Sequence, residues 1–283
     1  MARNPEINSL LSLLDDEDES IAVNAMAELL NREAELGEAL AELQESSHPL
    51  LRRRGHQLQA AITLRRRRRE FIRKLQAPRV DLIDGLIDVH LQWYDNDSRP
   101  ELESLWSDFR QEAARCPLHT LEELAYFMRK SGFTAQPETT LRPENYCIGP
   151  ILENHTGSAA LLAAIAGAIT PAPFRMVRVM GDFALYDGEG RLLVPAHDWQ
   201  LCPAPGIGLC EFWDPRMLLR YASLTLFSCA VNSDSFRYVL TIAQALSGTT
   251  GDETLDYLPY PYCPADEEPE SDGAEESGKN PGR

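Results

Sequence analysis

The sequence contains no long uninterrupted apolar run and no closely spaced pair of cysteines. A membrane-spanning helix needs about 20 consecutive apolar residues. The longest apolar stretch, Ser158 to Ile169, is soon interrupted by Thr170 and two prolines. The six cysteines are scattered without a CxxC pair, which indicates neither a zinc site nor a disulfide framework. We therefore expect no metal, no cofactor and no membrane association.

Positive charge is also scarce, since 27 lysines and arginines face 44 aspartates and glutamates and leave a net charge of −17. Such a balance argues against non-specific attraction to nucleic acid or to anionic membranes. The first residues, MARNP, are followed by acidic residues and show no secretory signal. We expect a protein of the reducing cytoplasm, and its 43% apolar content suffices for a real core.

The N-terminal region, residues 1–78, has a helical pattern throughout. Leucine-rich stretches predict four helices, at residues 10–14, 21–30, 36–43 and 50–75. The acidic stretch Asp15 to Glu19 lies between the first two and favours the start of the next helix. Two antiparallel pairs of this kind resemble HEAT repeats.

The remaining chain divides into a core at 79–212, a helical hairpin at 213–250 and an extended acidic tail at 251–283 that we expect to be disordered. Amphipathic spacing predicts helices at 80–93, 102–113 and 121–130, and an Asp214–Pro215 pair predicts the start of the hairpin. Four short strands are predicted at 174–179, 183–186, 191–194 and 208–212. The predicted fold class is α+β and mainly helical, with a core helix packed on a small antiparallel sheet.

Several short motifs follow one another through the core. They are Gly132–Phe133, then Arg142 to Tyr146, then Leu152 to Gly157 before an apolar helix, and then Met180 to Phe183. This order and spacing resembles the SirB family of bacterial transglutaminase-like proteins. The resemblance implies a transglutaminase-like core, in which a helix packs on a small sheet and a cleft lies between them.

A transglutaminase-type site needs a thiolate at the N-terminus of a helix, a histidine and an orienting acid. Here the nucleophile position falls near Leu161, and Ser158 lies about one helical turn away. Asp182 stands where the family has its histidine, and Asp198 lies near the third position. We therefore expect a catalytically inactive protein-binding or scaffold module, with the cleft between the Gly157 helix and the Gly181 strand as a ligand or peptide site.

Two alternatives stay open. An amide hydrolase or acyltransferase would use a displaced set, Cys147 with His197 and Asp198, provided that these side chains lie within hydrogen-bond reach. The plainer interpretation makes Cys147 a small buried apolar residue and places His197 and Asp198 in a surface turn.

The second alternative rests on a concentration of arginine. Ten of the 27 basic residues lie between residues 52 and 74, including five in a row: Arg65, Arg66, Arg67, Arg68 and Arg69. They would bind RNA, phosphate or an acidic partner through the planar guanidinium. The plainer interpretation, which we favour, pairs them with the acidic stretch Asp15 to Glu19 and with neighbouring helices.

Overall fold

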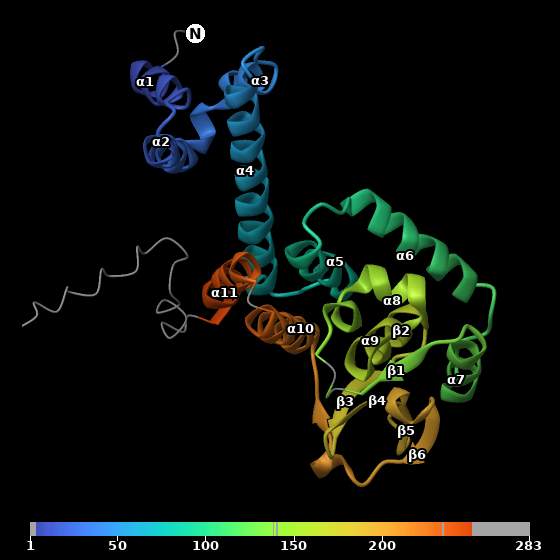
Figure 1. Ribbon diagram of the computed structural model, residues 1–283. Coiled ribbons are helices and arrows are strands. Elements are labelled where there is room, and N and C mark those ends of the chain that lie inside the picture. Colours follow the sequence, from blue (N-terminus) through green and yellow to red (C-terminus); the bar gives the residue numbers. More distant parts are fainter. Residues whose placement is uncertain (1–3, 138, 140, 234, 251–283) are drawn as a thin grey trace, which may run out of the picture.

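The computed structural model describes residues 4–137, 139, 141–233 and 235–250. Within these residues the chain is a mainly helical α+β protein with 11 α-helices, a five-stranded antiparallel sheet and a small parallel pair of strands (Figure 1). The predicted fold class is confirmed. The predicted acidic tail lies outside the described residues, and so does Asp234. No described helix combines the length and apolar character that crossing a membrane requires.

Four helices form the N-terminal region, as predicted: α1 (Pro5–Leu13), α2 (Glu19–Asn31), α3 (Gly37–Gln44) and α4 (Pro49–Gln76). Asn4 and Asp18 cap α1 and α2 by accepting backbone N–H groups. The helix α4 is a long rod that leads from these helices to the rest of the molecule (Figure 1). Its Leu58 belongs to the small N-terminal core, whereas its Phe71 belongs to the main core, so α4 joins the two.

An ion-pair network fastens the end of α4 to the next helices. Asp88, which is buried on α5 (Leu82–Trp93), accepts from Lys74 at 2.8 Å and pairs with Arg99 at the start of α6 (Arg99–Ala113). Asp84 pairs with the same two cations. Lys74, one of the basic residues that follow the arginine run, thus fastens α4 to α5.

The helix α9 (Ala159–Ile169) lies at the centre of the main core (Figure 1). All of its residues are buried except Gly167 and Ala168. It is preceded by α7 (Leu121–Lys130), which has a Thr120–Glu123 capping box, and by α8 (Ile148–Asn154), which the sequence analysis did not predict.

The antiparallel sheet has the order β6-β5-β4-β3-β7. Its strands are β3 (Arg175–Val179), β4 (Asp182–Tyr186), β5 (Arg191–Val194), β6 (Gln200–Pro203) and β7 (Glu211–Phe212). The first three match predicted strands closely. The predicted strand 208–212 is wrong in its first part, because Ile207–Leu209 forms a 3-10 turn. The strand β6 and the parallel pair β1 (Thr134–Gln136) and β2 (Thr156–Ser158) were not predicted.

The two faces of the sheet belong to different clusters. Phe183, Leu185 and Leu193 pack into the main core with α9, which confirms the predicted helix-on-sheet arrangement. Val177, Tyr186 and other side chains of the opposite face form a separate cluster. Residues of the segment from β6 to β7, among them Phe212, pack against that second cluster.

The hairpin α10 (Pro215–Asn232) and α11 (Phe236–Thr250) completes the main core. Asp214 caps α10 by accepting the backbone N–H of Met217 at 2.9 Å, as the Asp214–Pro215 pair predicted. The helix α10 packs along α5, and α11 packs on α4. The predicted hairpin is confirmed, and α11 continues to Thr250.

Candidate functional site

The N-terminal end of α9, where the resemblance places a nucleophile, is closed. Ser158 is buried and caps the helix, with its Oγ accepting the backbone N–H of Leu161 at 3.3 Å. The Leu161 side chain is fully buried. Neither residue therefore presents a nucleophilic atom to solvent.

Asp182 and His197 form a surface pair that the sequence analysis did not predict. Asp182 begins β4, and His197 ends the 3-10 turn Pro195–His197 after β5. The His197 Nε2 and Asp182 Oδ2 atoms lie 3.4 Å apart, and the side chains are 52% and 47% exposed. The antiparallel pairing of β4 with β5 brings together two residues that the sequence analysis had placed in different sets.

Asp198 has a structural role in the turn that follows. It adopts a left-handed conformation with φ 51°, and its side chain is exposed. The next residue, Trp199, also has a positive φ and is fully buried, and its indole Nε1 donates to the Phe133 carbonyl at 2.7 Å. The strained turn thus seats Trp199 in the core.

Cys147 lies in the core at the N-cap of α8 and is fully buried. Burial raises the pKa of its thiol well above the ordinary value, and neighbouring Cys229 and Glu144 raise it further. Across the described residues, no hydrogen bond joins this thiol to His197 or Asp198. The displaced set therefore lacks the geometry that a cysteine enzyme needs.

His90 is a buried histidine of α5 that makes two polar contacts. Its Nδ1 accepts the backbone N–H of Gly149 at 3.4 Å, and its Nε2 lies 2.9 Å from Asp97 Oδ2. Burial lowers the pKa of His90, and Asp97 opposes that shift. A neutral ring satisfies both contacts if Nε2 carries the proton, so His90 holds α5 against α8.

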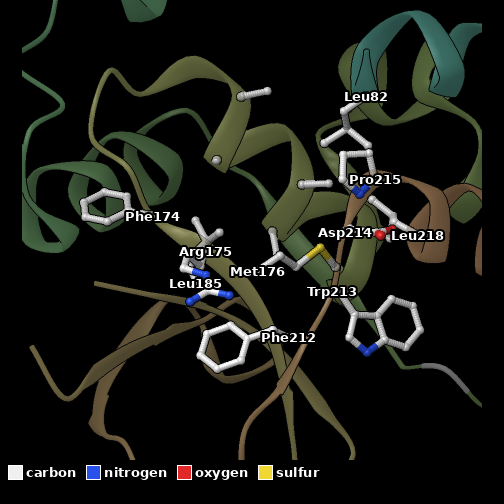
Figure 2. Close-up of a pocket in the computed structure, with 14 residues that line it drawn as sticks. Leu82, Phe174, Arg175, Met176, Leu185, Phe212, Trp213, Asp214, Pro215 and Leu218 are labelled. Carbon is white, nitrogen blue, oxygen red and sulfur yellow. The ribbon is translucent and has the colours of Figure 1, made fainter. Parts of the chain in front are cut away.

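A cleft of about 580 Å³ opens between the second half of α9 and the sheet (Figure 2). The space exists because the residues that α9 contributes to the lining are small, namely Ala163, Ala164, Gly167 and Ala168. Most of the remaining lining is apolar and comes from Leu82, Phe174, Met176, Leu185, Phe212, Trp213, Pro215 and Leu218.

Two charged residues contribute atoms to the lining of the cleft, Arg175 and Asp214. Arg175 is an exposed residue, and its guanidinium lies 3.8 Å from the centre of the Phe212 ring. Figure 2 shows the two side chains together, and the strand register places them on the sheet face that carries Val177 and Tyr186. Asp214 contributes its carboxylate to the α10 cap. The Trp213 ring packs edge-on against Phe183 at 4.7 Å, and its buried Nε1 has no hydrogen-bond partner in the part of the chain that the structure describes.

The predicted cleft was between the Gly157 helix, which is α9, and the Gly181 strand. The cleft in the structure also lies between α9 and the sheet, but at the end of α9 away from Gly157 and at the end of the strand away from Gly181. Its lining includes Met176 near the start of β3, whereas Gly181 lies in the hairpin turn at the far end of that strand. The signal that could have located the cleft is the run of small residues on α9. A sequence read for periodicity shows only an apolar helix there.

The five consecutive arginines meet several partners. Arg66 and Arg69 share Glu33, at 3.6 and 3.2 Å. Arg67 donates to the Asp95 carbonyl at 2.8 Å, and Arg68 donates to Gln244 of α11. Arg65 is half-buried on the same helix. Burial, together with Arg65 and Arg69, lowers the pKa of Arg68.

The predicted pairing of these arginines with the acidic stretch Asp15 to Glu19 is not what the structure shows. Arg54 contacts the start of that stretch instead, by donating to the carbonyls of Leu14 and Asp16 at 2.5 and 2.7 Å.

Three arginines of α4 are largely exposed to solvent. Arg66, Arg69 and Arg73, spaced by three and four residues, are 72%, 66% and 80% exposed, and we call them the arginine surface.

No family model, curated protein or solved structure matches this chain. The resemblance to the SirB family thus stays a prediction from motif order. No group of three or more potential metal ligands occurs among the residues that the structure describes.

Proposed function

We propose that the protein is a catalytically inactive binding module and that the cleft between α9 and the sheet is its binding site. One observation carries the proposal, namely an apolar hollow of about 580 Å³ that is already formed in the free chain. Binding sites for small ligands are usually apolar clefts of about 300 to 1,000 Å³ with a few polar groups. The lining of this cleft has that composition.

The chemistry at the other end of α9 supports a non-catalytic role. Acyl transfer by a cysteine needs an accessible thiolate beside a base. Cys147 is buried with a raised pKa, and Leu161 has no nucleophilic atom. The exposed Asp182–His197 pair has no cysteine bonded to it within the described residues.

Filling the cleft tests this proposal. Nile red, a neutral dye that fluoresces in apolar surroundings, should bind the full chain with one high-affinity site. Ala168→Phe places a ring at the half-buried wall of the cleft and should abolish that site. The matched control is Ala60→Phe, which makes the same change at an exposed position of α4. Equal dye binding by Ala168→Phe and the unmodified protein would contradict the proposal.

A second candidate function rests on the arginine surface, for which we propose an acidic segment of a partner protein as the ligand. Glu33 and Glu70 are the acidic side chains that approach these three arginines among the described residues. Guanidinium groups pair with carboxylates through two parallel hydrogen bonds, and such contacts weaken with salt.

A labelled glutamate-rich peptide and a labelled single-stranded RNA test this second candidate by fluorescence anisotropy. Arg66→Gln with Arg69→Gln should weaken peptide binding. The control pair Arg129→Gln with Lys130→Gln removes the same charge from an exposed end of α7 and should leave binding unchanged. Binding of RNA in place of the peptide would assign the surface to nucleic acid, and equal losses in both pairs would indicate a general charge effect.

A further inference from the structure

We infer that the acidic tail of this chain, residues 251–283, binds the arginine surface and that an acidic segment of a partner must displace it. This inference rests on the second candidate function, because it concerns the same three arginines. It adds an occupant of the surface from within the chain, and three features of the molecule support that choice.

The first feature is the arrangement of the guanidinium groups on α4. Arg69 donates to Glu33 at 3.2 Å. Arg66 and Arg73 lie 3.6 and 3.9 Å from the glutamates that they approach, which is beyond hydrogen-bond distance. A guanidinium carries five N–H donors in a plane. The arginine surface therefore keeps both donors and positive charge for further carboxylates.

The second feature is the charge of the tail. Residues 251–283 contain ten acidic and two basic residues, and five of the acidic ones occur between residues 266 and 272. The chain as a whole has a net charge of −17, so few of its surfaces attract an acidic segment. Carboxylates and guanidinium groups pair through charge-assisted hydrogen bonds. The arginine surface thus complements the tail in charge and in hydrogen-bonding groups.

The third feature is the position of the helix that precedes the tail. The helix α11 packs on α4, and its Gln244 accepts from Arg68, the neighbour of Arg69 (Figure 1). The helix continues for six residues to Thr250, about 9 Å further along its axis. The 15 residues 251–265 can span up to about 50 Å. The acidic run that follows them can therefore reach the arginine surface.

The covalent link gives the tail an advantage over a separate partner. A tethered segment meets its site at an effective concentration on the order of millimolar, and a free segment has to compete with that concentration. Contacts between single exposed charges are individually weak. The tether therefore decides which acidic segment occupies the surface until a partner with stronger contacts displaces the tail.

Cross-linking of the full chain tests whether the tail lies on the arginine surface. Arg66→Lys with Arg69→Lys keeps both charges and supplies amines that a carbodiimide joins to nearby carboxylates. Mass spectrometry of the monomer fraction should find these lysines joined to carboxylates of residues 266–272. Lys130 at the exposed end of α7 is the control in the same sample, because α7 lies on the other side of the main core from α11 (Figure 1).

Peptide affinity tests whether the tail covers the surface. Glu267→Gln, Glu268→Gln and Glu270→Gln together remove charge from the tail of the full chain. This variant should bind the labelled glutamate-rich peptide at least about threefold more tightly than the unmodified chain does. The matched control removes the same charge from exposed positions of α6 and should leave the peptide affinity unchanged. Its substitutions are Glu101→Gln, Asp108→Asn and Glu112→Gln.

The other outcomes separate the inference from the second candidate function. Absence of the cross-links, equal cross-linking at Lys130, or cross-links confined to a dimer fraction would overturn the inference. Equal gains in peptide affinity for the two triple variants would overturn it as well. An unchanged peptide affinity in the tail variant would overturn the inference but not the second candidate function. Cross-links to the tail, with no peptide binding by either the unmodified chain or the tail variant, would support the tail contact and contradict the second candidate function.

Discussion

The two ends of α9 meet their surroundings in different ways. At the first end, which we call the closed end and define as α8, β2 and the start of α9, a Cβ added to Gly157 would come within 2.8 Å of Ile151. At the other end, which we call the open end, a Cβ added to Gly167 would meet Leu185 at 3.3 Å, and Gly167 and Ala168 are not fully buried. One apolar helix thus provides both a sealed core and one wall of a cleft, and the size of its side chains makes the difference.

This contrast changes where a function should be sought. The motif order directs attention to the closed end, because family resemblance places chemistry at the helix N-terminus. The packing there excludes solvent from Ser158 and Leu161. The open end carries no recognisable motif, yet it has an apolar cleft of about 580 Å³.

The largest expected effect concerns cysteine reactivity. Iodoacetamide should label the exposed Cys116 at least about a hundredfold faster than Cys147, because Cys147 reacts only after local opening of the core. Peptide mass spectrometry over a time course at several pH values measures both rates in one sample. Rapid labelling of Cys147 below pH 7 would show a working thiolate at the closed end and would revive the enzyme alternative.

A core truncation tests how tightly the closed end is packed. Leu161→Ala should lower the free energy of unfolding by about 2–5 kcal/mol, because it removes a fully buried side chain and leaves a cavity. Chemical denaturation measures the change. A loss below about 1 kcal/mol would mean that the closed end is as loosely packed as the open end.

The same substitution at the two glycines should have opposite effects. Gly157→Ala places a methyl group against Ile151 and should destabilise the protein by about 1–3 kcal/mol. Gly167→Ala replaces a helical glycine beside the cleft and should stabilise it by up to about 1 kcal/mol, less the cost of the Leu185 contact. Denaturation of the two variants in parallel compares the ends directly. Similar changes for both would remove the distinction drawn here.

The smallest effect is expected at the exposed pair near the closed end. Asp182→Asn should change the free energy of unfolding by less than about 1 kcal/mol, because surface ion pairs contribute little. Chemical denaturation measures the change. A large loss of stability would show that this pair supports the turn that seats Trp199.

Local signals in the sequence were sufficient for many elements. The Asp214–Pro215 pair marks the start of α10, and periodicity predicts the strands β3, β4 and β5. These features depend on residues that are close together in the sequence, so the sequence alone is sufficient to predict them. The helix α8 and the parallel pair β1–β2 were missed because each is short, and the pair joins Thr134 to Thr156, which are 22 positions apart in the chain.

The sequence by itself determined the mainly helical α+β class, most helices, three strands and the absence of a cysteine on the core helix. Only the tertiary structure decided that Arg66 and Arg69 turn to Glu33, that Asp182 meets His197, and that α9 is closed at one end and open at the other. The physical reason is that capping and periodicity act within a few residues, whereas ion pairs and cavities depend on which distant side chains share a space. The cleft exists because Ala and Gly on α9 face strands and a helix that lie many residues further along the chain.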